Sequence, residues 1–312
     1  MSEYRYSLER YKTPKDKYKC PNCDKKTFTR YVDMYTNNEH LHETVGICNR
    51  KIKCNYHYPP KQYFKDNNLK TNINYKSITK PKKKEIKKTS FIDKKLLLNS
   101  LDNSKTNKFI RFLETELFGA EATKQVVENY RIGTSNHWDG ATIFWQIDEA
   151  NNIRSGKIMQ YNEYTGKRVK KPINLINWVH KTEMLKNFNL EQCYFGLHLI
   201  NLDKDKPIAI VESEKTAVIA SVYLPEFIWI ACGSVSNLSA KNTEALKGRD
   251  VVLFPDLNCY QLWKDKAAKF SLLIFWQISN LLENNASPEE KEQGYDLADY
   301  LINLQIDFKK HI

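Results

Sequence analysis

The chain has 312 residues, of which 41% are apolar and 12% aromatic, and its formal net charge is +12. These values give room for one large or two to three small domains with real hydrophobic cores. The longest apolar run, residues 270–282, is interrupted by Gln277 and Ser279 and is too short to span a bilayer. It predicts a buried helix. The polar start lacks a signal-peptide pattern, so we expect a soluble cytoplasmic protein without a membrane partner.

The positive charge is concentrated in the first third of the chain. Up to Lys108 there are 26 basic and 11 acidic residues, a net of +15, whereas the remaining 23 basic and 26 acidic residues give −3. Such an excess suggests an electrostatic footprint for phosphates. Lysines and asparagines in a solvated tail are the alternative explanation for part of it.

Four of the seven cysteines cluster near the N-terminus: Cys20, Cys23, Cys48 and Cys54. A Cys-x2-Cys turn presents two thiolates to one ion, and zinc takes four such ligands in a tetrahedron. The spacing between Cys48 and Cys54 is longer than usual, and His57 is the reserve ligand in place of Cys48. Strand-like runs at residues 27–34 and 44–47 complete the pattern of a zinc ribbon. In a cytosolic chain these cysteines favour a metal over disulfides.

Basic side chains alternate with Phe and Tyr around the cysteines, a mixture that suits single-stranded nucleic acid. We therefore assign residues 1–65 to a zinc-ribbon nucleic-acid-binding domain. Residues 66–95 are rich in Lys and Asn, have little apolar periodicity and predict a basic linker. The periodicity that follows predicts helices over residues 91–101, 107–118 and 120–129, and then a β-meander with strands at 141–147 and 153–161 and a basic turn at 165–171.

Two apolar runs in the last third end in a carboxylate. Residues 207–219 (PIAIVESEKTAVI) form a short strand pattern that ends in Glu212 and passes into a helix, and residues 250–258 (DVVLFPDLN) end in Asp256. A strand at 227–231 and a Gly233-Ser234 turn lie between them. Ligands of parallel sheets gather at the carboxyl ends of the strands, so the two carboxylates are expected to meet over one divalent metal.

VESEKTA and DLN resemble the Glu and Asp-x-Asp motifs of the TOPRIM fold, which DnaG-type primases share with topoisomerases and some nucleases. The resemblance implies that Asp256 is the main metal ligand and that Glu212 is a second ligand or a general base. Asn258 stands where the second Asp is expected and adds no charge. Further acids, Asp296 and Asp299, fall at helical spacing and compensate for it, or they face solvent. Lys215 either touches phosphate or forms a surface salt bridge with Glu214.

The middle of the chain resembles the N-terminal part of the DnaG primase core. Its counterparts here are Arg131-Ile132-Gly133, a strand ending at Asp148, and Phe195-Gly196-Leu197 before the TOPRIM strand. The resemblance implies contacts with nucleic acid or nucleotides for a set of basic residues that also includes Lys215: Arg131, Lys157, Lys167, Arg168, Lys170 and Lys171. The expected architecture is thus α/β, with the zinc ribbon and linker, an α+β primase-like module at 96–205 and a C-terminal TOPRIM domain with a Rossmann-like parallel sheet at 206–312.

The order of these modules is that of bacterial and phage primases, and it suggests a stand-alone type from a phage, plasmid or other mobile element. The resemblance implies a DNA primase, a nucleotidyltransferase that makes short primers on single-stranded DNA from nucleoside triphosphates. Zn²⁺ would be structural and Mg²⁺ or Mn²⁺ catalytic, and a replicative helicase is a possible partner. Two alternatives remain open: a single-strand-binding replication protein with weak or no catalysis, and a TOPRIM nuclease.

Overall fold

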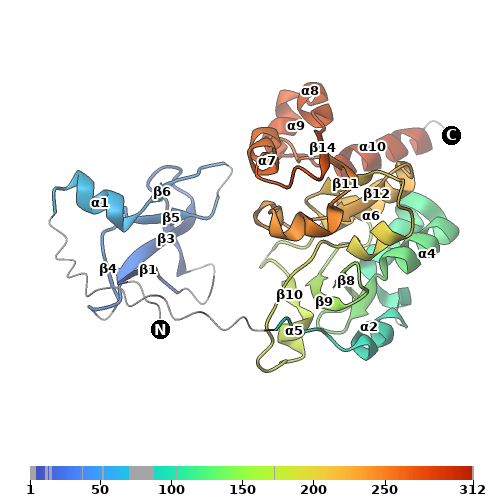
Figure 1. The fold of residues 1–312 in the computed structure, drawn as a ribbon, viewed down its shortest axis with the longest axis horizontal. Coiled ribbons are helices and arrows are strands. Elements are labelled where there is room, and N and C mark those ends of the chain that lie inside the picture. The colour runs from blue at the N-terminus through green and yellow to red at the C-terminus, as the bar shows by residue number, and fades with distance from the viewer. Residues whose placement is uncertain are drawn as a thin grey trace. The chain divides into compact units, whose positions relative to one another are not determined.

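The computed structural model describes residues 5–10, 13, 16–36, 38–50, 53–69, 88–102, 104–171 and 173–310, with side chains up to residue 303. The chain forms two compact units, Met1–Glu85 and Ile86–Ile312. Figure 1 shows their elements. Most of the predicted linker, residues 70–87, lies outside the described residues.

The first unit is a small antiparallel sheet built around a long central strand, β3 (Lys26–Asp33). Its strand order is β1-β3-β5-β6, and two further strands pair with β3. The other elements are β1 (Tyr6–Leu8), β2 (Tyr18–Lys19), β4 (Glu39–His40), β5 (Gly46–Cys48), β6 (His57–Tyr58) and α1 (Pro60–Asp66). The strands predicted at 27–34 and 44–47 are therefore confirmed. Gly46 is required where β3 and β5 pair, because an added Cβ would lie 2.3 Å from the Thr29 carbonyl oxygen.

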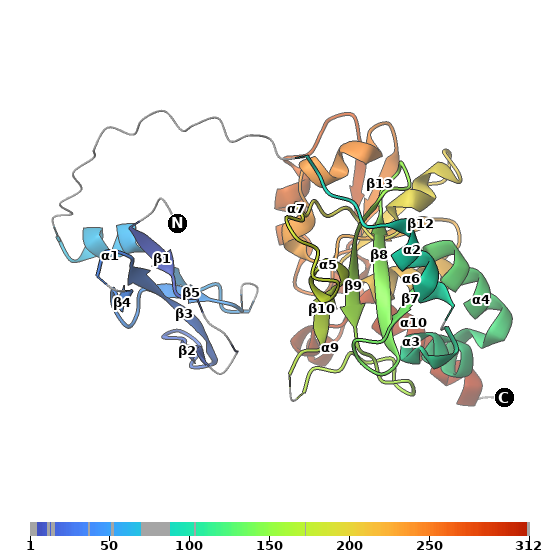
Figure 2. The ribbon, with the colours of Figure 1, turned by 90° about the horizontal axis from the view of Figure 1, so that it is seen from below.

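The second unit begins with the predicted helices. They are α2 (Lys94–Leu101), a 3-10 turn η2 (Ser104–Thr106), α3 (Lys108–Phe112), a π-helical turn η3 (Leu113–Phe118) and α4 (Gly119–Tyr130). Asp93 and Asn107 cap α2 and α3, since their side chains accept hydrogen bonds from the first free backbone amides. Figure 2 shows α2, α3 and α4 along one side of β8.

A four-stranded antiparallel sheet follows, in the order β10-β9-β8-β7. Its strands are β7 (Gly133–Ser135), β8 (Ala141–Ile147), β9 (Ile153–Met159) and β10 (Ile176–Trp178), and α5 (Val179–Thr182) comes next. The β-meander predicted where the helical periodicity ends is confirmed. Asp148 ends β8 and holds the turn, since its carboxylate accepts from the Asn152 amide at 2.8 Å and from Arg154 Nε at 2.6 Å.

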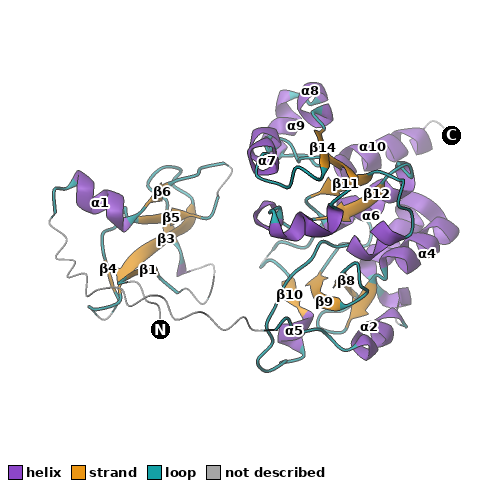
Figure 3. Ribbon diagram, in the orientation of Figure 1, coloured by secondary structure: helices purple, strands orange, loops and turns teal. Residues whose placement is uncertain are grey.

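The last third contains a parallel sheet in the order β12-β11-β13-β14. The strands are β11 (Ile208–Val211), β12 (Ile228–Ala231), β13 (Asp250–Leu253) and β14 (Phe275–Ile278). The 3-10 turn η4 (Leu197–Asn201) precedes β11. The elements between the strands include α6 (Glu214–Tyr223), η5 (Val235–Asn237), η6 (Lys241–Leu246) and α7 (Tyr260–Ala267). After β14 come α8 (Leu281–Asn285), α9 (Pro288–Gln293) and α10 (Leu297–Lys310). Figure 3 shows the two sheets of this unit with helices around them.

The prediction of a buried helix over residues 270–282 is wrong. These residues form β14 and its flanks, and Leu272, Leu273 and Phe275 are 99%, 64% and 68% exposed. Phe, Trp and Ile favour strands, and pairing with β13 satisfies the backbone of this run. Phe270, Ile274 and Leu282 are buried in the core, so burial explains only part of the apolar character of this run.

One hydrophobic core extends through both sheets of the second unit. Phe144 on β8 packs edge-on against Phe195, with ring centroids 5.3 Å apart, and Phe195 pairs with Ala231 on β12. The buried Tyr130 hydroxyl donates to the Trp229 carbonyl at 2.7 Å. Residues 96–205 and 206–312 thus share one compact unit, and their separation into two functional modules stays a prediction. No helix in the described part of the chain is long and apolar enough to cross a membrane.

Candidate functional site

The four N-terminal cysteines converge from two segments of the ribbon. Their sulfur atoms all lie within 4.8 Å of one another, with 3.6 Å between Cys20 and Cys54 and 4.0 Å between Cys23 and Cys48. A tetrahedral zinc with Zn–S bonds of about 2.3 Å separates its sulfurs by about 3.8 Å. The residues present therefore fit a structural zinc ion, and the predicted four-cysteine set is confirmed as a cluster.

Polar neighbours support the sulfurs of this cluster. The Asn22 amide donates to Cys54 Sγ at 3.4 Å and lowers the pKa of that thiol to about 6, which favours the thiolate that a metal needs. Thr27 Oγ1 lies 3.3 Å from Cys48 Sγ. The reserve ligand His57 is not in the cluster, since its Nε2 lies 3.1 Å from the Tyr31 hydroxyl. Cys48 therefore completes the set.

A second group of titratable residues lies at the carboxyl ends of the parallel strands. Glu212 follows β11 directly, Asp256 lies three residues beyond β13, and both are half-buried. Burial raises the pKa of Glu212, and nearby Glu214 and Asp296 raise it further. Burial also raises the pKa of Asp256 well above its ordinary value, followed by the charges of Asp296, Glu212 and Asp299. The structure thus brings the two predicted carboxylates together.

Asp296 and Asp299 form the start of α10 and face this group. Each backbone amide donates to the other's carboxylate at 3.0 Å, so the pair caps the helix reciprocally. Thr216 Oγ1 donates to Asp296 at 2.8 Å, and Lys215 lies 3.6 Å from Asp299. Both contacts come from the first turn of α6, next to Glu212. The acids at this position are therefore held against the strand ends rather than displayed to solvent.

Asn258 points elsewhere. It has a left-handed backbone with φ of 67° and is exposed. Its side-chain amide donates to the Lys291 carbonyl at 2.7 Å, and its backbone amide donates to Glu283 Oε1 at 2.6 Å. These bonds fix the loop after β13. Asp256 and Asn258 are the two predicted site residues of the DLN motif. Only Asp256 lies close enough to the other carboxylates for their charges to act on it.

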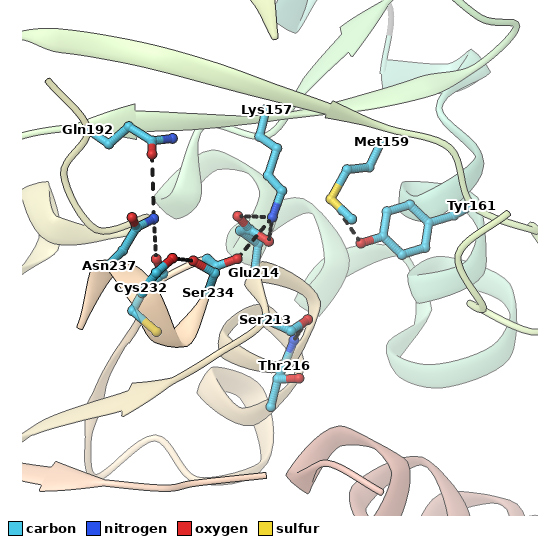
Figure 4. A network of polar contacts seen from close by, with 12 residues as sticks. Lys157, Met159, Tyr161, Gln192, Ser213, Glu214, Thr216, Cys232, Ser234 and Asn237 are labelled. Carbon is cyan, nitrogen blue, oxygen red and sulfur yellow. Dashed lines mark hydrogen bonds and ion pairs between the residues drawn. The ribbon is translucent and has the colours of Figure 1, made fainter. Parts of the chain in front are cut away.

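Sequence reasoning missed the buried ion pair between Lys157 on β9 and Glu214 on α6 (Figure 4). Lys157 Nζ lies 3.0 and 3.1 Å from the two Glu214 oxygens and 3.4 Å from the Gly233 carbonyl. Lys157 was predicted to contact nucleic acid, but here its ammonium is held inside the protein. Gly233, part of the predicted Gly-Ser turn, has φ of 73°, and a Cβ there would lie 3.2 Å from Glu214 Oε1.

The other predicted basic residues divide into two groups. Lys167, Lys170 and Lys171 are exposed on the segment after β9. Arg168 pairs with Tyr161 as an isolated bridge, and the charges of Arg168, Glu214 and Asp296 all act on the pKa of the Tyr161 hydroxyl, which burial raises. The backbone bridge to Tyr161 therefore holds this segment against the end of β9. Arg131 is not part of this segment: it ends α4 in a left-handed conformation and donates to Asn151 at 3.4 Å.

The carboxylates are spaced more widely than the ligands of an all-protein metal cage. Among the described residues, the cysteines form the one set of three or more His, Cys, Asp or Glu whose ligand atoms lie within 4.8 Å of one another. Magnesium is usually held by one or two carboxylates together with waters and substrate oxygens. Two half-buried carboxylates with raised pKa values fit that mode of binding.

Two family models match parts of the chain. Residues 4–69 match a zinc β-ribbon finger, in agreement with the cysteine cluster. Residues 107–257 match a domain of unknown function, DUF6371, which spans both sheets up to the residue after Asp256. No curated protein matches the chain.

Solved structures similar to this chain include primase fragments and catalytic domains. The primase fragment of the bacteriophage T7 primase-helicase is 14% identical, with 59% of this chain and 70% of that one covered and a TM-score of 0.33. The RNA polymerase domain of Mycobacterium tuberculosis primase DnaG is 10% identical, with 64% and 80% covered and a TM-score of 0.40. The Aquifex aeolicus primase, comprising zinc-binding and RNA polymerase domains, is 12% identical, with 95% and 80% covered and a TM-score of 0.31.

Proposed function

We propose that this protein is a primase-like nucleotidyltransferase that makes short primers on single-stranded DNA, and that its parallel sheet is a TOPRIM domain. One observation carries the proposal: Glu212 and Asp256 follow neighbouring parallel strands in a half-buried site, where burial raises the pKa of both and the charges of Asp296 and Glu212 raise that of Asp256 further. Carboxylates held together against their mutual repulsion favour a bound divalent cation.

In the proposed site, Glu212 and Asp256 hold Mg²⁺ or Mn²⁺, each through a carboxylate oxygen. When bound, the ion would lower the pKa of an attacking hydroxyl and neutralise charge on the transferring phosphate. Asp296, positioned by Thr216 at 2.8 Å, supplies the further negative charge that Asn258 lacks. Asp299 is held by Lys215 and orients the start of α10. Glu212 would alternatively accept a proton from the attacking hydroxyl as a general base.

The basic segment after β9 is proposed to bind the nucleic acid beside the carboxylates. Lys167, Lys170 and Lys171 are exposed, and they follow a strand whose Lys157 reaches the Glu214 carboxylate next to Glu212. Exposed lysines neutralise phosphates without reading sequence. The zinc ribbon, with Arg30 stacked 4.1 Å from the Tyr18 ring centroid, offers a second surface for single strands. Nucleoside triphosphates would be the second substrate.

The test is a primer-synthesis assay with the full-length chain, single-stranded DNA, labelled nucleoside triphosphates and Mg²⁺ or Mn²⁺. Asp256→Ala should abolish product while leaving DNA affinity within about twofold, because affinity comes mainly from Lys and Arg contacts. Asp250→Ala is the matched control, since Asp250 is an exposed aspartate at the opposite end of the same strand. It should keep full activity.

The two alternative functions predict different results in the same primer-synthesis assay. Wild-type cleavage of the DNA that Asp256→Ala loses would indicate a TOPRIM nuclease. Salt-sensitive DNA binding without synthesis or cleavage under either metal would indicate a binding protein without turnover. Equal synthesis by wild type and Asp256→Ala would refute the proposed site altogether.

A further inference from the structure

The parallel sheet has one covered edge and one open edge. At the first edge, Ala231 of β12 exchanges hydrogen bonds with Phe195 at 2.9 and 3.0 Å. At the other edge, β14 pairs with β13 alone among the described residues. Phe275 and Ser279 donate their amides toward β13, so the alternate residues Trp276 and Ile278 turn their amides and carbonyls outward. No hydrogen bond of the described chain satisfies those outward groups.

Large apolar side chains surround this open edge. Leu272 is 99% exposed, Leu273 64%, Phe275 68% and Leu281 49%. Natural proteins usually protect an edge strand with charges, proline, a bulge or a covering loop, because an apolar open edge pairs with other chains. Residues 271–282 contain no charged residue and no proline. The edge is therefore built for contact with another strand.

We propose that β14 pairs antiparallel with β14 of a second copy of this chain, joining two parallel sheets across a two-fold axis at Gln277. In that register Trp276 lies opposite Ile278 of the second copy, and the two such pairs make about four backbone hydrogen bonds. Leu273 precedes Gln277 by four residues and Leu281 follows it by four. Leu273 lies in the turn before β14 and Leu281 begins α8, so the two-fold axis brings Leu273 of one copy to the same side of the paired strands as Leu281 of the other.

Charge on the two sides of the strand supports a second copy as the occupant. Exposed Lys264 and Lys269 precede β14, whereas Glu289 and the half-buried Glu290 follow it. Antiparallel pairing places the basic side of one copy beside the acidic side of the other, and a parallel alignment would oppose like charges. The surface is thus complementary to itself in one orientation.

Sedimentation velocity of the full-length chain over a concentration series tests this proposal. Wild type should show a monomer–dimer equilibrium, and Phe275→Lys or Leu273→Lys should weaken it at least about tenfold, or about 1.4 kcal/mol. Leu202→Lys is the matched control, since Leu202 is 76% exposed but lies next to η4, away from β14. It should leave the dissociation constant unchanged.

A cross-link tests the register. In this register Gln277 of one copy lies opposite Gln277 of the other, in a non-hydrogen-bonded pair. Their Cα atoms would be about 4.5 Å apart, within the span of a disulfide. Gln277→Cys treated with diamide should therefore give a covalent dimer that a thiol reductant reverses. Gln125→Cys, an exposed position on α4, should not. A wild type that stays monomeric, a dimer unaffected by both lysine variants, or a Gln277→Cys that cross-links no better than Gln125→Cys would each overturn the proposal.

Discussion

Replacing Lys157 by Met should strongly destabilise the second unit. The Lys157 and Glu214 side chains are only 11% and 3% exposed, and they join the antiparallel sheet to the first turn of α6. Met keeps the apolar stem but removes the ammonium. The Glu214 carboxylate then stays buried without the two hydrogen bonds at 3.0 and 3.1 Å that now satisfy it.

The size of the effect follows from the asymmetry of buried ion pairs. Removing one partner costs about 3–5 kcal/mol because it leaves an uncompensated charge, whereas replacing both by apolar groups of similar volume is often neutral. Lys157→Met alone should therefore lose about 3–5 kcal/mol of the free energy of unfolding. Adding Glu214→Met should recover most of that loss. Lys157→Arg should fall between, since it keeps the charge but changes the geometry.

Urea denaturation followed by tryptophan fluorescence measures the free energy of unfolding of the second unit. All six tryptophans lie between Trp138 and Trp276, so the signal reports the second unit alone. The salt dependence of DNA binding should be unchanged by Lys157→Met under conditions where the variant is folded, because this ammonium does not face solvent. A loss below about 1 kcal/mol, or a double variant no more stable than the single one, would refute this reading of the pair.

Three further predictions concern the metal and nucleic-acid sites. Protein prepared without added metal should carry about one zinc per chain by elemental analysis, and Cys20→Ser should lose it while the tryptophan-monitored unfolding stays unchanged. Replacing Lys167, Lys170 and Lys171 together by Ala should reduce the slope of log affinity for single-stranded DNA against log salt by about 2 units, measured by fluorescence anisotropy; an unchanged slope would remove this segment from the interface. Without divalent ions, the free energy of unfolding should fall as pH rises from about 4, the ordinary pKa of an aspartate, through the raised pKa of Asp256, because the unfolded chain releases that proton first. Asp256→Asn should flatten this decline in urea titrations, and Mg²⁺ should counteract it only in wild type.

Local patterns were sufficient wherever one short segment determines the structure. The Cys20–Cys23 turn, the apolar and β-branched runs of β3 and β8 and the helix end at residue 118 each depend on neighbours in sequence. Their physics is the geometry of one turn or the alternation of one strand. The position of Glu212 and Asp256 after adjacent strands was also predictable, because parallel strands bring their carboxyl ends to one edge.

The prediction failed at β14 because an apolar run of that length has no periodicity that separates a buried helix from an edge strand. What decides is whether β13 offers a pairing edge, and that depends on residues elsewhere in the chain. Burial was inferred from apolar character, although exposed apolar residues at Leu272 and Phe275 show that the inference runs in one direction only. The proposed contact with a second copy restores the burial that the single chain does not supply.

The contacts that the sequence could not supply are those that cross between elements far apart in the chain. Lys157 and Glu214 are 57 residues apart and Thr216 and Asp296 are 80 apart, and nothing in either local pattern marks them as partners. Yet these contacts separate residues of the same type into different roles. The Lys157 ammonium is buried beside the site, whereas Lys167 is exposed. Similarly, the Asp296 charge acts on Asp256, whereas the Asn258 side chain donates to the Lys291 carbonyl. A motif therefore identifies where acids gather, whereas the hydrogen bonds between α6, α10 and β9 decide which of them can share a cation.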